Sequence, residues 1–295
     1  MKIVLTGNRG FVGRHIQEAL VKAGHEVIPC NTAVRNLLQY GNWPTDDCII
    51  DEDLIIHLAA WTKAGDFCLH HQAEQWVINQ QLNTNALRLR QGTGVRFITM
   101  GTSCGYDPSL SRKSEELYMD GTPDTNLYTY AMTKRMLLVG LDAQKAQYGW
   151  NYSYYVPNTM YGPHFELDDT HFIFDLIKKI VDARYIGTKV VLWGDGYQKR
   201  ELVYIDDVVK QIVNNLETDV GVANLAPGVE YTIREYASMI CHIVGYNENH
   251  IEYDTTAFTG VRSKKLVNSL GIEYTQIESG LFSTIEYYIK AKYGM

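Results

Sequence analysis

Tyr130 and Lys134 lie four residues apart in the stretch YAMTK, a spacing that puts both side chains on one face of a helix. An ammonium group beside a phenol stabilises the phenolate and lowers the phenol pKa toward neutrality. Such a pair passes a proton to or from a carbonyl or carbinol oxygen while a nicotinamide exchanges hydride with the carbon. A surface lysine above a packed tyrosine has the same spacing, so the chemistry needs support from other residues.

A second set of reactive side chains lies in GTSCGYD, residues 101–107, directly after the apolar run VRFITM. Thr102 and Ser103 bring hydroxyls, and Cys104 brings a thiol, to the carboxyl end of a predicted strand. In doubly wound folds this end of a parallel strand lines the crevice in which ligands bind. Taken alone, Cys104 is more typical of a small buried residue than of a reactive thiol.

The first predicted strand runs into GNRGFVG, which places glycines at positions 7, 10 and 13. Glycine lets the backbone approach a pyrophosphate closely, and a helix that starts near Phe11 directs its free N–H groups at that anion. The second predicted strand ends at Asn31, without the acidic residue that usually binds the ribose of NAD. Arg9 and Arg35 are placed to face a 2′-phosphate instead. The pattern predicts a dinucleotide site for NADP, with NAD as the alternative.

The elements that position these residues alternate between apolar β-rich runs and amphipathic helical patterns. This alternation implies parallel strands joined by crossovers, in a sheet covered on both faces. After Pro157 this regular alternation ends, and we interpret the rest of the chain as a smaller α+β lobe. The expected strands are residues 2–6, 26–30, 53–60, 95–100, 151–157 and 189–196. The expected helices are residues 12–23, 73–91, 130–149, 171–185, 204–217 and 232–245. Residues 158–170 are expected to be loop.

The predicted fold class is therefore α/β, with a Rossmann-type doubly wound parallel sheet and a smaller C-terminal α+β substrate lobe. We assign residues 1–157, with about 202–224, to a dinucleotide-binding domain. Residues 158–201 and 225–295 form the second lobe.

Composition argues against several other functions. The 295 residues are 45% hydrophobic, and the net charge of −7 with scattered Lys and Arg argues against nucleic-acid binding. No stretch approaches the roughly 18 apolar residues that span a bilayer, and the N-terminus has no signal-peptide pattern. Five widely spread cysteines without a CxxC motif argue against a metal site or a disulfide framework. We expect a cytoplasmic protein that binds no membrane and no metal.

The glycine triplet, the strand-end hydroxyl and the YxxxK pair occur in the order and spacing of the short-chain dehydrogenase/reductase superfamily. Over essentially its whole length the chain resembles the extended branch, the NAD-dependent epimerase/dehydratase family. HLAA (57–60), Asn79, Asn85 and PNTMYGP (157–163) support this resemblance. The cofactor-binding residues that it implies are Gly7, Asn8, Arg9, Gly10, Phe11, Val12, Gly13, Asn31, Leu58, Ala59, Ala60, Lys134, Pro157, Thr159, Met160 and His171.

Within this family, three segments are similar to segments of the GDP-L-fucose synthases, which are GDP-4-keto-6-deoxymannose 3,5-epimerase/4-reductases. The three segments are GTSCGYD, YGPHFELDDTHFIFDLIKK and WGDGYQKRELVYIDD. The resemblance implies that Thr102 is the catalytic hydroxyl, because it lies four residues before Tyr106. It makes Cys104 and His171 the acid/base pair that epimerises the sugar. The implied substrate-binding residues are Ser103, Asn158, Lys179, Trp193, Arg200 and Arg262.

The chemistry that the resemblance implies fits these residue types. The C3 and C5 hydrogens of a 4-keto sugar are acidic because the carbanion is an enolate, and a tuned thiolate and imidazole exchange such protons near neutral pH. Thr102 and Tyr130 would stabilise the enolate oxygen, and Tyr130 would protonate it as hydride arrives from NADPH. The partners implied are a nucleotide-diphosphate sugar, held by the second lobe, and a second copy of the chain, paired through two helices that include 130–149.

Departures from the family pattern leave the sugar and the nucleotide open. Segment 253–271 is shorter than usual and lacks the usual acidic residue, and Gly105 replaces a larger apolar residue, which we expect to open space beside Cys104. A related 6-deoxy or heptose nucleotide is an alternative substrate. Two other functions are alternatives: a 4-reductase or 4-epimerase with bound NAD and no C3/C5 epimerisation, and a noncatalytic dinucleotide-sensing or scaffold protein.

Overall fold

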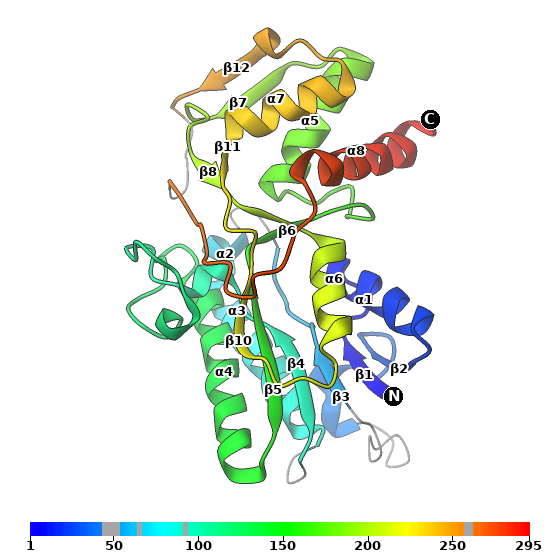
Figure 1. Ribbon diagram of the computed structural model, residues 1–295, viewed down its shortest axis with the longest axis vertical. Coiled ribbons are helices and arrows are strands. Elements are labelled where there is room, and N and C mark those ends of the chain that lie inside the picture. Colours follow the sequence, from blue (N-terminus) through cyan, green and yellow to red (C-terminus); the bar gives the residue numbers. More distant parts are fainter. Residues whose placement is uncertain (43–53, 64–66, 91–93, 257–261) are drawn as a thin grey trace. The chain divides into compact units, whose positions relative to one another are not determined.

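The computed structural model describes residues 1–42, 54–63, 67–90, 94–256 and 262–295, which form two compact units (Figure 1). The first unit comprises Met1–Pro157 and Val208–Leu225, and the second comprises Asn158–Asp207 and Ala226–Met295. Residue 53 of the strand expected at 53–60 and residue 91 of the helix expected at 73–91 lie outside the described residues.

A six-stranded sheet in the order β10-β5-β4-β3-β1-β2 forms the centre of the first unit (Figure 1). All neighbouring pairs are parallel, and β1, β3 and β4 carry completely buried side chains such as Ile3, Leu54 and Ile98. The predicted Rossmann-type sheet is thereby confirmed. The strands are β1 (Lys2–Thr6), β2 (Glu26–Cys30), β3 (Leu54–His57), β4 (Arg96–Met100), β5 (Asn151–Pro157) and β10 (Gly221–Leu225).

The helices of the first unit follow from the strand order. Because β2 lies on one side of β1 and β3 on the other, right-handed crossovers place the helices that follow β1 and β3 on opposite faces. This reversal creates a crevice at the carboxyl ends of β1 and β3. The elements are α1 (Phe11–Lys22), η1 (Leu37–Asn42), α2 (Phe67–His70), α3 (Gln72–Arg88), η3 (Ser103–Gly105), η4 (Glu115–Leu117), α4 (Tyr128–Tyr148) and most of α6 (Ile205–Asn214), with α3 and α4 packed together.

Strand β3 is shorter than the predicted 53–60, because the chain leaves the sheet after His57. The Leu58 N–H donates to both the carbonyl and the hydroxyl of Thr6, and the Ala59 N–H donates to this hydroxyl, all at 3.2 Å. This side-chain contact turns the segment toward the end of β1.

The described part of the second unit contains three two-stranded sheets and three longer helices. Residues 158–170, predicted as loop, include strand β6, because these residues pair with a distant strand. The pairs are β6 (Thr159–Tyr161) with β9 (Leu202–Tyr204), β7 (Val190–Trp193) with β12 (Ile251–Asp254), and β8 (Lys199–Arg200) with β11 (Tyr231–Thr232); the helices are α5 (Phe172–Ile186), α7 (Ile233–Val244), the short η5 (Glu248–His250) and α8 (Ile277–Tyr293).

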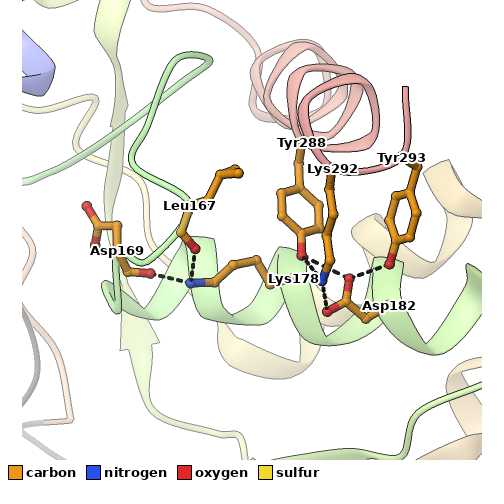
Figure 2. A network of polar contacts seen from close by, with 7 residues as sticks. All are labelled: Leu167, Asp169, Lys178, Asp182, Tyr288, Lys292 and Tyr293. Atoms are coloured by element: carbon orange, nitrogen blue, oxygen red, sulfur yellow. Dashed lines mark hydrogen bonds and ion pairs between the residues drawn. The ribbon is translucent and has the colours of Figure 1, made fainter. Parts of the chain in front are cut away.

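One carboxylate holds the C-terminal helix α8 against α5 (Figure 2). Asp182 accepts hydrogen bonds from the hydroxyls of Tyr288 at 2.9 Å and Tyr293 at 2.7 Å, and from Lys292 Nζ at 2.6 Å. Three donors on one carboxylate fix the register between the two helices.

Candidate active site

The glycine loop after β1 lies beside the segment that follows β3. Gly7 has a φ of +73°, and a Cβ at this position would lie 2.6 Å from the Ala59 nitrogen. Helix α1 begins at Phe11, with Gly10 as an N-cap that offers no side-chain hydrogen bond. The first turn therefore presents backbone N–H groups at the crevice, which is the arrangement that binds a pyrophosphate.

Two asparagines brace this loop against the end of β2. Asn31 donates to Asn8 Oδ1 at 2.9 Å and accepts the N–H groups of Ala33 and Val34, and Asn8 donates to Gln17 at 2.7 Å. Beside Asn8, an open concavity is lined by Arg9, Arg14, Gln17, Glu18, Val21 and Lys22. The predicted residues Asn8, Arg9 and Asn31 thus lie together, and the cations from α1 beside them had not been singled out from the sequence.

A series of buried polar side chains supports the segment Leu58–Ala60, which was predicted to bind the cofactor. The Thr6 hydroxyl lies 2.8 Å from His57 Nδ1, and His57 Nε2 lies 3.1 Å from Asn83 Oδ1. Burial lowers the pKa of His57 to about 3, and the charge of Lys134 lowers it further. His57 is therefore a neutral hydrogen-bonding residue, which links β1 and β3 to α3.

Thr102 and Tyr130 meet on the first unit. Thr102 directly follows the β4 end, is 8% exposed, and its hydroxyl accepts the Cys104 N–H at 3.3 Å. It also hydrogen-bonds the phenol of Tyr130, which lies in the first turn of α4. Lys134 follows one helical turn later and is buried. The predicted hydroxyl, tyrosine and lysine are thus held by β4 and α4 of one unit.

The pKa of Tyr130 differs from the expectation that Lys134 lowers it. Burial raises the pKa of Tyr130 well above its ordinary value, and neighbouring Cys104 raises it further, against the lowering by the Thr102 hydrogen bond. Burial lowers the pKa of Lys134 to about 8. At neutral pH the phenol keeps its proton, which is the form that a proton donor to a carbonyl requires.

A row of buried tyrosines ties Thr102 to α4. The Thr102 N–H donates to the Tyr118 hydroxyl at 3.3 Å, the hydroxyls of Tyr118 and Tyr154 lie 3.2 Å apart, and Tyr154 donates to the Lys134 carbonyl at 2.9 Å. Arg135, itself 4% exposed, donates to the Gly105 carbonyl at 2.9 Å. These contacts fix the segment that carries Ser103 and Cys104 against α4.

The space expected beside Cys104 because of Gly105 is filled. A Cβ at Gly105 would lie 2.6 Å from Cε2 of Tyr118, whose ring is 1% exposed. The small residue at this position therefore accommodates a buried ring and opens no room next to the thiol.

Gly105→Ala should lower the free energy of unfolding by about 1–3 kcal/mol, because the added methyl group must displace the Tyr118 ring. Urea unfolding measures the change. Gly94→Ala is the matched control, since among the described residues a Cβ there meets only the Tyr148 carbonyl, at 3.8 Å. Tyr118→Leu in the Gly105→Ala background should recover part of the loss; equal stability of the two alanine variants would contradict this account.

His171 and the predicted segment after β5 belong to the second unit. His171 is the N-cap residue of α5; its side chain is 51% exposed, and Nδ1 lies 2.7 Å from Asp169 Oδ1. Thr159 and Met160 lie in β6. Because Cys104 is in the first unit, its pairing with His171 stays a prediction.

Asn158 has a bracing role in the second unit. Its Nδ2 donates to Glu201 at 2.7 Å and to the Lys264 carbonyl at 2.6 Å. The completely buried Glu201 also accepts the N–H groups of Gly228 at 2.5 Å and Leu266 at 2.9 Å. One carboxylate therefore joins four segments of this unit, and sequence analysis had not identified it.

Burial raises the pKa of Glu201 from 4.5 to about 7, although its hydrogen bonds with Leu266, Asn158 and Gly228 lower it. A carboxyl group whose pKa is higher in the folded state contributes stability that is complete below pH 4.5 and is lost as the pH rises through about 7. The two values correspond to about 3 kcal/mol.

We expect the unfolding free energy of the wild type to fall between pH 5 and pH 7 more steeply than that of Glu201→Gln. Chemical unfolding monitored at several pH values measures this difference. Glu273→Gln, which changes an exposed carboxylate of the same unit that does not act on the pKa of Glu201, should keep the wild-type slope. Parallel slopes for the wild type and Glu201→Gln would exclude Glu201 as the titrating group.

The remaining predicted substrate residues lie in the second unit. Arg200 and Arg262 lie on adjacent backbone segments, because Lys199, next to Arg200, donates its N–H to the Arg262 carbonyl at 2.8 Å. Trp193 is 62% exposed at the end of β7. Lys179 forms an ion pair with Asp175 at 2.9 Å on α5.

No helix among the described residues is long and apolar enough to cross a membrane. No group of three or more His, Cys, Asp or Glu side chains in the described part of the chain is placed to hold a metal ion.

Residues 3–226 match the family described as NAD dependent epimerase/dehydratase family. The GDP-L-colitose synthase of Yersinia pseudotuberculosis is 28% identical over 308 residues, which cover 99% of this chain and 99% of the relative. The GDP-L-fucose synthase of Escherichia coli K12 is 27% identical over 315 residues, which cover 98% of this chain and 97% of the relative.

Among solved structures, a GDP-L-fucose synthetase from Naegleria fowleri bound to NADP is similar in fold. The TM-score is 0.85 at 20% sequence identity, over 98% of this chain and 94% of that chain. The likeness therefore extends over both units of the chain.

Proposed function

We propose, since the chain belongs to the NAD dependent epimerase/dehydratase family, that it is a nucleotide-sugar 3,5-epimerase/4-reductase that acts on an NDP-4-keto-6-deoxyhexose with hydride from NADPH. The observation that carries this proposal is the grouping of Thr102, Tyr130 and Lys134 at the ends of β4 and α4. Relatives named as GDP-L-colitose and GDP-L-fucose synthases, which match almost the whole chain, support a nucleotide sugar as substrate.

The reduction requires a proton donor at the C4 oxygen. Bound NADPH would supply hydride to C4. The half-buried, protonated phenol of Tyr130 donates to the oxygen that becomes the hydroxyl, and Thr102 holds the phenol in place. The ammonium of Lys134, whose pKa is about 8, is charged at neutral pH and stabilises the negative charge that develops as the proton leaves.

NADP is the proposed dinucleotide. Position 31, at the end of β2, carries an amide that is used to brace Asn8, so no carboxylate faces the ribose there. Arg9, Arg14 and Lys22 surround the neighbouring concavity and bring positive charge to the position expected for a 2′-phosphate. The NADP-bound relative from Naegleria supports this choice.

The proposed function also includes epimerisation of the sugar at C3 and C5. Cys104 follows the catalytic Thr102 by two residues, and His171 caps α5 with a half-exposed imidazole. We assign them to the removal and return of protons at the carbons beside the C4 carbonyl, with the enolate oxygen stabilised by Thr102 and Tyr130. The proposed substrate-binding residues of the second unit are Asn158, Lys179, Trp193, Arg200 and Arg262.

The test uses the purified chain with GDP-4-keto-6-deoxymannose and NADPH in D₂O. We expect NADPH oxidation together with deuterium at C3 and C5 of the product. Oxidation without deuterium would replace the proposal by a simple 4-reductase. Retained NAD with interconversion at C4 and no net NADPH use would indicate a 4-epimerase. A folded protein without turnover on any 4-keto sugar nucleotide would overturn the proposed enzymatic function.

Homodimerisation through α3 and α4 is also proposed. These packed helices carry exposed apolar side chains, among them Val77 at 61% and Val139 at 43% exposure, and Trp76 and Met136 are exposed on the same two helices. Apolar side chains on two adjacent helices are typical of a surface that is covered by a second copy.

Val139→Glu should shift the protein toward monomers, because the charge would be buried at the helix pair without a partner. Sedimentation velocity over a concentration series measures the change. Val21→Glu, at an exposed valine of α1, is the matched control and should leave the assembly unchanged. A wild type that sediments as a monomer at all concentrations would refute the proposed dimer.

A further inference from the structure

Asp169 lies against the Nδ1 side of the proposed catalytic His171. Its Oδ1 is 2.7 Å from His171 Nδ1 and also accepts the backbone N–H of His171 at 2.8 Å. The ring of His171 meets the edge of Phe174 at 6.4 Å on its own helix. The carboxylate therefore fixes the imidazole through both the ring and the backbone.

Asp169 is itself held in place. Lys178 of α5 donates from Nζ to the carbonyls of Asp169 at 2.5 Å and Leu167 at 3.2 Å (Figure 2). The Asp169 N–H donates to the Glu166 carbonyl at 2.8 Å. These contacts hold the loop before α5 from both sides, so the position of the carboxylate does not depend on the imidazole alone.

The charge on Asp169 follows from its surroundings. Burial acts to raise the pKa of this carboxyl, but the hydrogen bond and charge of His171 outweigh it, so the pKa stays below its ordinary value. The side chain is 20% exposed, against 51% for the imidazole. Of the other charged groups nearby, Asp175 pairs with Lys179 at 2.9 Å, and Asp168 is exposed.

An ionised carboxylate only accepts hydrogen bonds, so the proton in this contact belongs to Nδ1 of the imidazole. In a neutral imidazole the other nitrogen then has a free lone pair. Nε2 is consequently the atom of His171 that is available to a substrate.

We propose that Asp169 is a positioning residue that holds His171 as the Nδ1–H tautomer and reserves Nε2 for proton exchange with the sugar; this inference rests on the function proposed above. In the forward step a C–H bond next to the carbonyl breaks, its electron pair moves into the enolate, and the proton binds Nε2. In the return step the opposite face of the enolate carbon takes a proton from the Cys104 thiol, and the S–H electron pair remains on the sulfur.

The first measurement is the tautomer, which does not need turnover. NMR of ¹⁵N-histidine-labelled protein, with His171 assigned through His171→Gln, should show the Nδ1–H tautomer in the wild type. Asp169→Ala should move the neutral ring toward Nε2–H, whereas the matched control Asp168→Ala should not. Asp169→Asn keeps an oxygen acceptor without the charge and should give an intermediate distribution.

The second measurement is deuterium incorporation at C3 and C5 of the product. Asp169→Ala should lower it by roughly 10- to 100-fold, a part of the 10²–10⁴ that a positioned acid or base contributes. Binding of NADPH should not change, and Asp168→Ala should exchange like the wild type. Asp169→Asn should again lie between them.

The outcomes separate two kinds of failure. A wild-type tautomer and wild-type exchange in folded Asp169→Ala would overturn the positioning role while leaving the proposed function intact. Reduced exchange without a tautomer change would also overturn it, since the defect would then be structural. A folded wild type that reduces the substrate without any exchange would refute the epimerase, and the role of Asp169 would fall with it.

Discussion

Replacing Tyr130 by phenylalanine should lower the rate of NADPH oxidation by roughly 10²- to 10⁴-fold, the range for loss of a positioned proton donor. The half-buried phenol is hydrogen-bonded to Thr102 and protonated at neutral pH, so the variant loses one oxygen and one proton at the place where the product hydroxyl forms. The aromatic ring keeps its packing, and the fold should therefore be retained. Stopped-flow measurement of NADPH absorbance at saturating substrate gives the rate of the hydride step.

The control for this experiment lies in the same helix. Tyr128→Phe makes the same chemical change at a residue that is 45% exposed, and its rate should stay within a factor of about two, as expected of a surface substitution. NADPH affinity, measured by fluorescence titration, should be unchanged in both variants. Wild-type reduction by Tyr130→Phe would remove the tyrosine from the mechanism.

Cys104→Ser should lower deuterium incorporation at C3 and C5 by at least about 100-fold, because a serine hydroxyl is a far weaker acid than a thiol and does not supply the base. Reduction of a substrate that has already been epimerised should continue, since Thr102, Tyr130 and Lys134 are intact. The ratio of exchange to NADPH oxidation, measured by mass spectrometry and absorbance on one sample, isolates the step in which the thiol acts.

The chain offers a matched thiol for comparison. Cys68 is 5% exposed, and like Cys104 it raises the pKa of the Tyr130 phenol, so both sulfur atoms lie near the same group. Cys68→Ser should retain exchange. The assignment of the thiol would be wrong if Cys104→Ser exchanged like the wild type, and it would pass to Cys68 if only that variant lost exchange. Ser103→Ala tests in the same way whether the neighbouring hydroxyl takes part.

The local order of elements was predictable because the pattern that carries it is local. The strands at 2–6, 26–30 and 151–157 coincide with β1, β2 and β5, since each is a short apolar run bounded by a change of periodicity. The glycine loop between β1 and α1 and the Tyr130–Lys134 spacing on α4 are likewise written in consecutive residues. The sequence by itself therefore determined the Rossmann-type sheet and the order of the groups proposed for catalysis.

Contacts between distant residues were decided only by the tertiary structure. Strand β6 exists because it pairs with β9, and neither run has enough residues to signal a strand alone. The glycine at position 105 led us to predict an open space. The ring of Tyr118, from a later part of the chain, fills that space. A glycine in the sequence marks where a side chain is missing, and packing decides which neighbour uses the room.

The same reason governs the chemistry of the site. Spacing placed Tyr130 and Lys134 on one helix face, but burial raised the pKa of the phenol and left it protonated. Burial shifts the pKa of His57 to about 3 and that of Glu201 to about 7. Residue types and their order follow from the sequence, whereas protonation depends on desolvation and on partners that only the folded chain brings together.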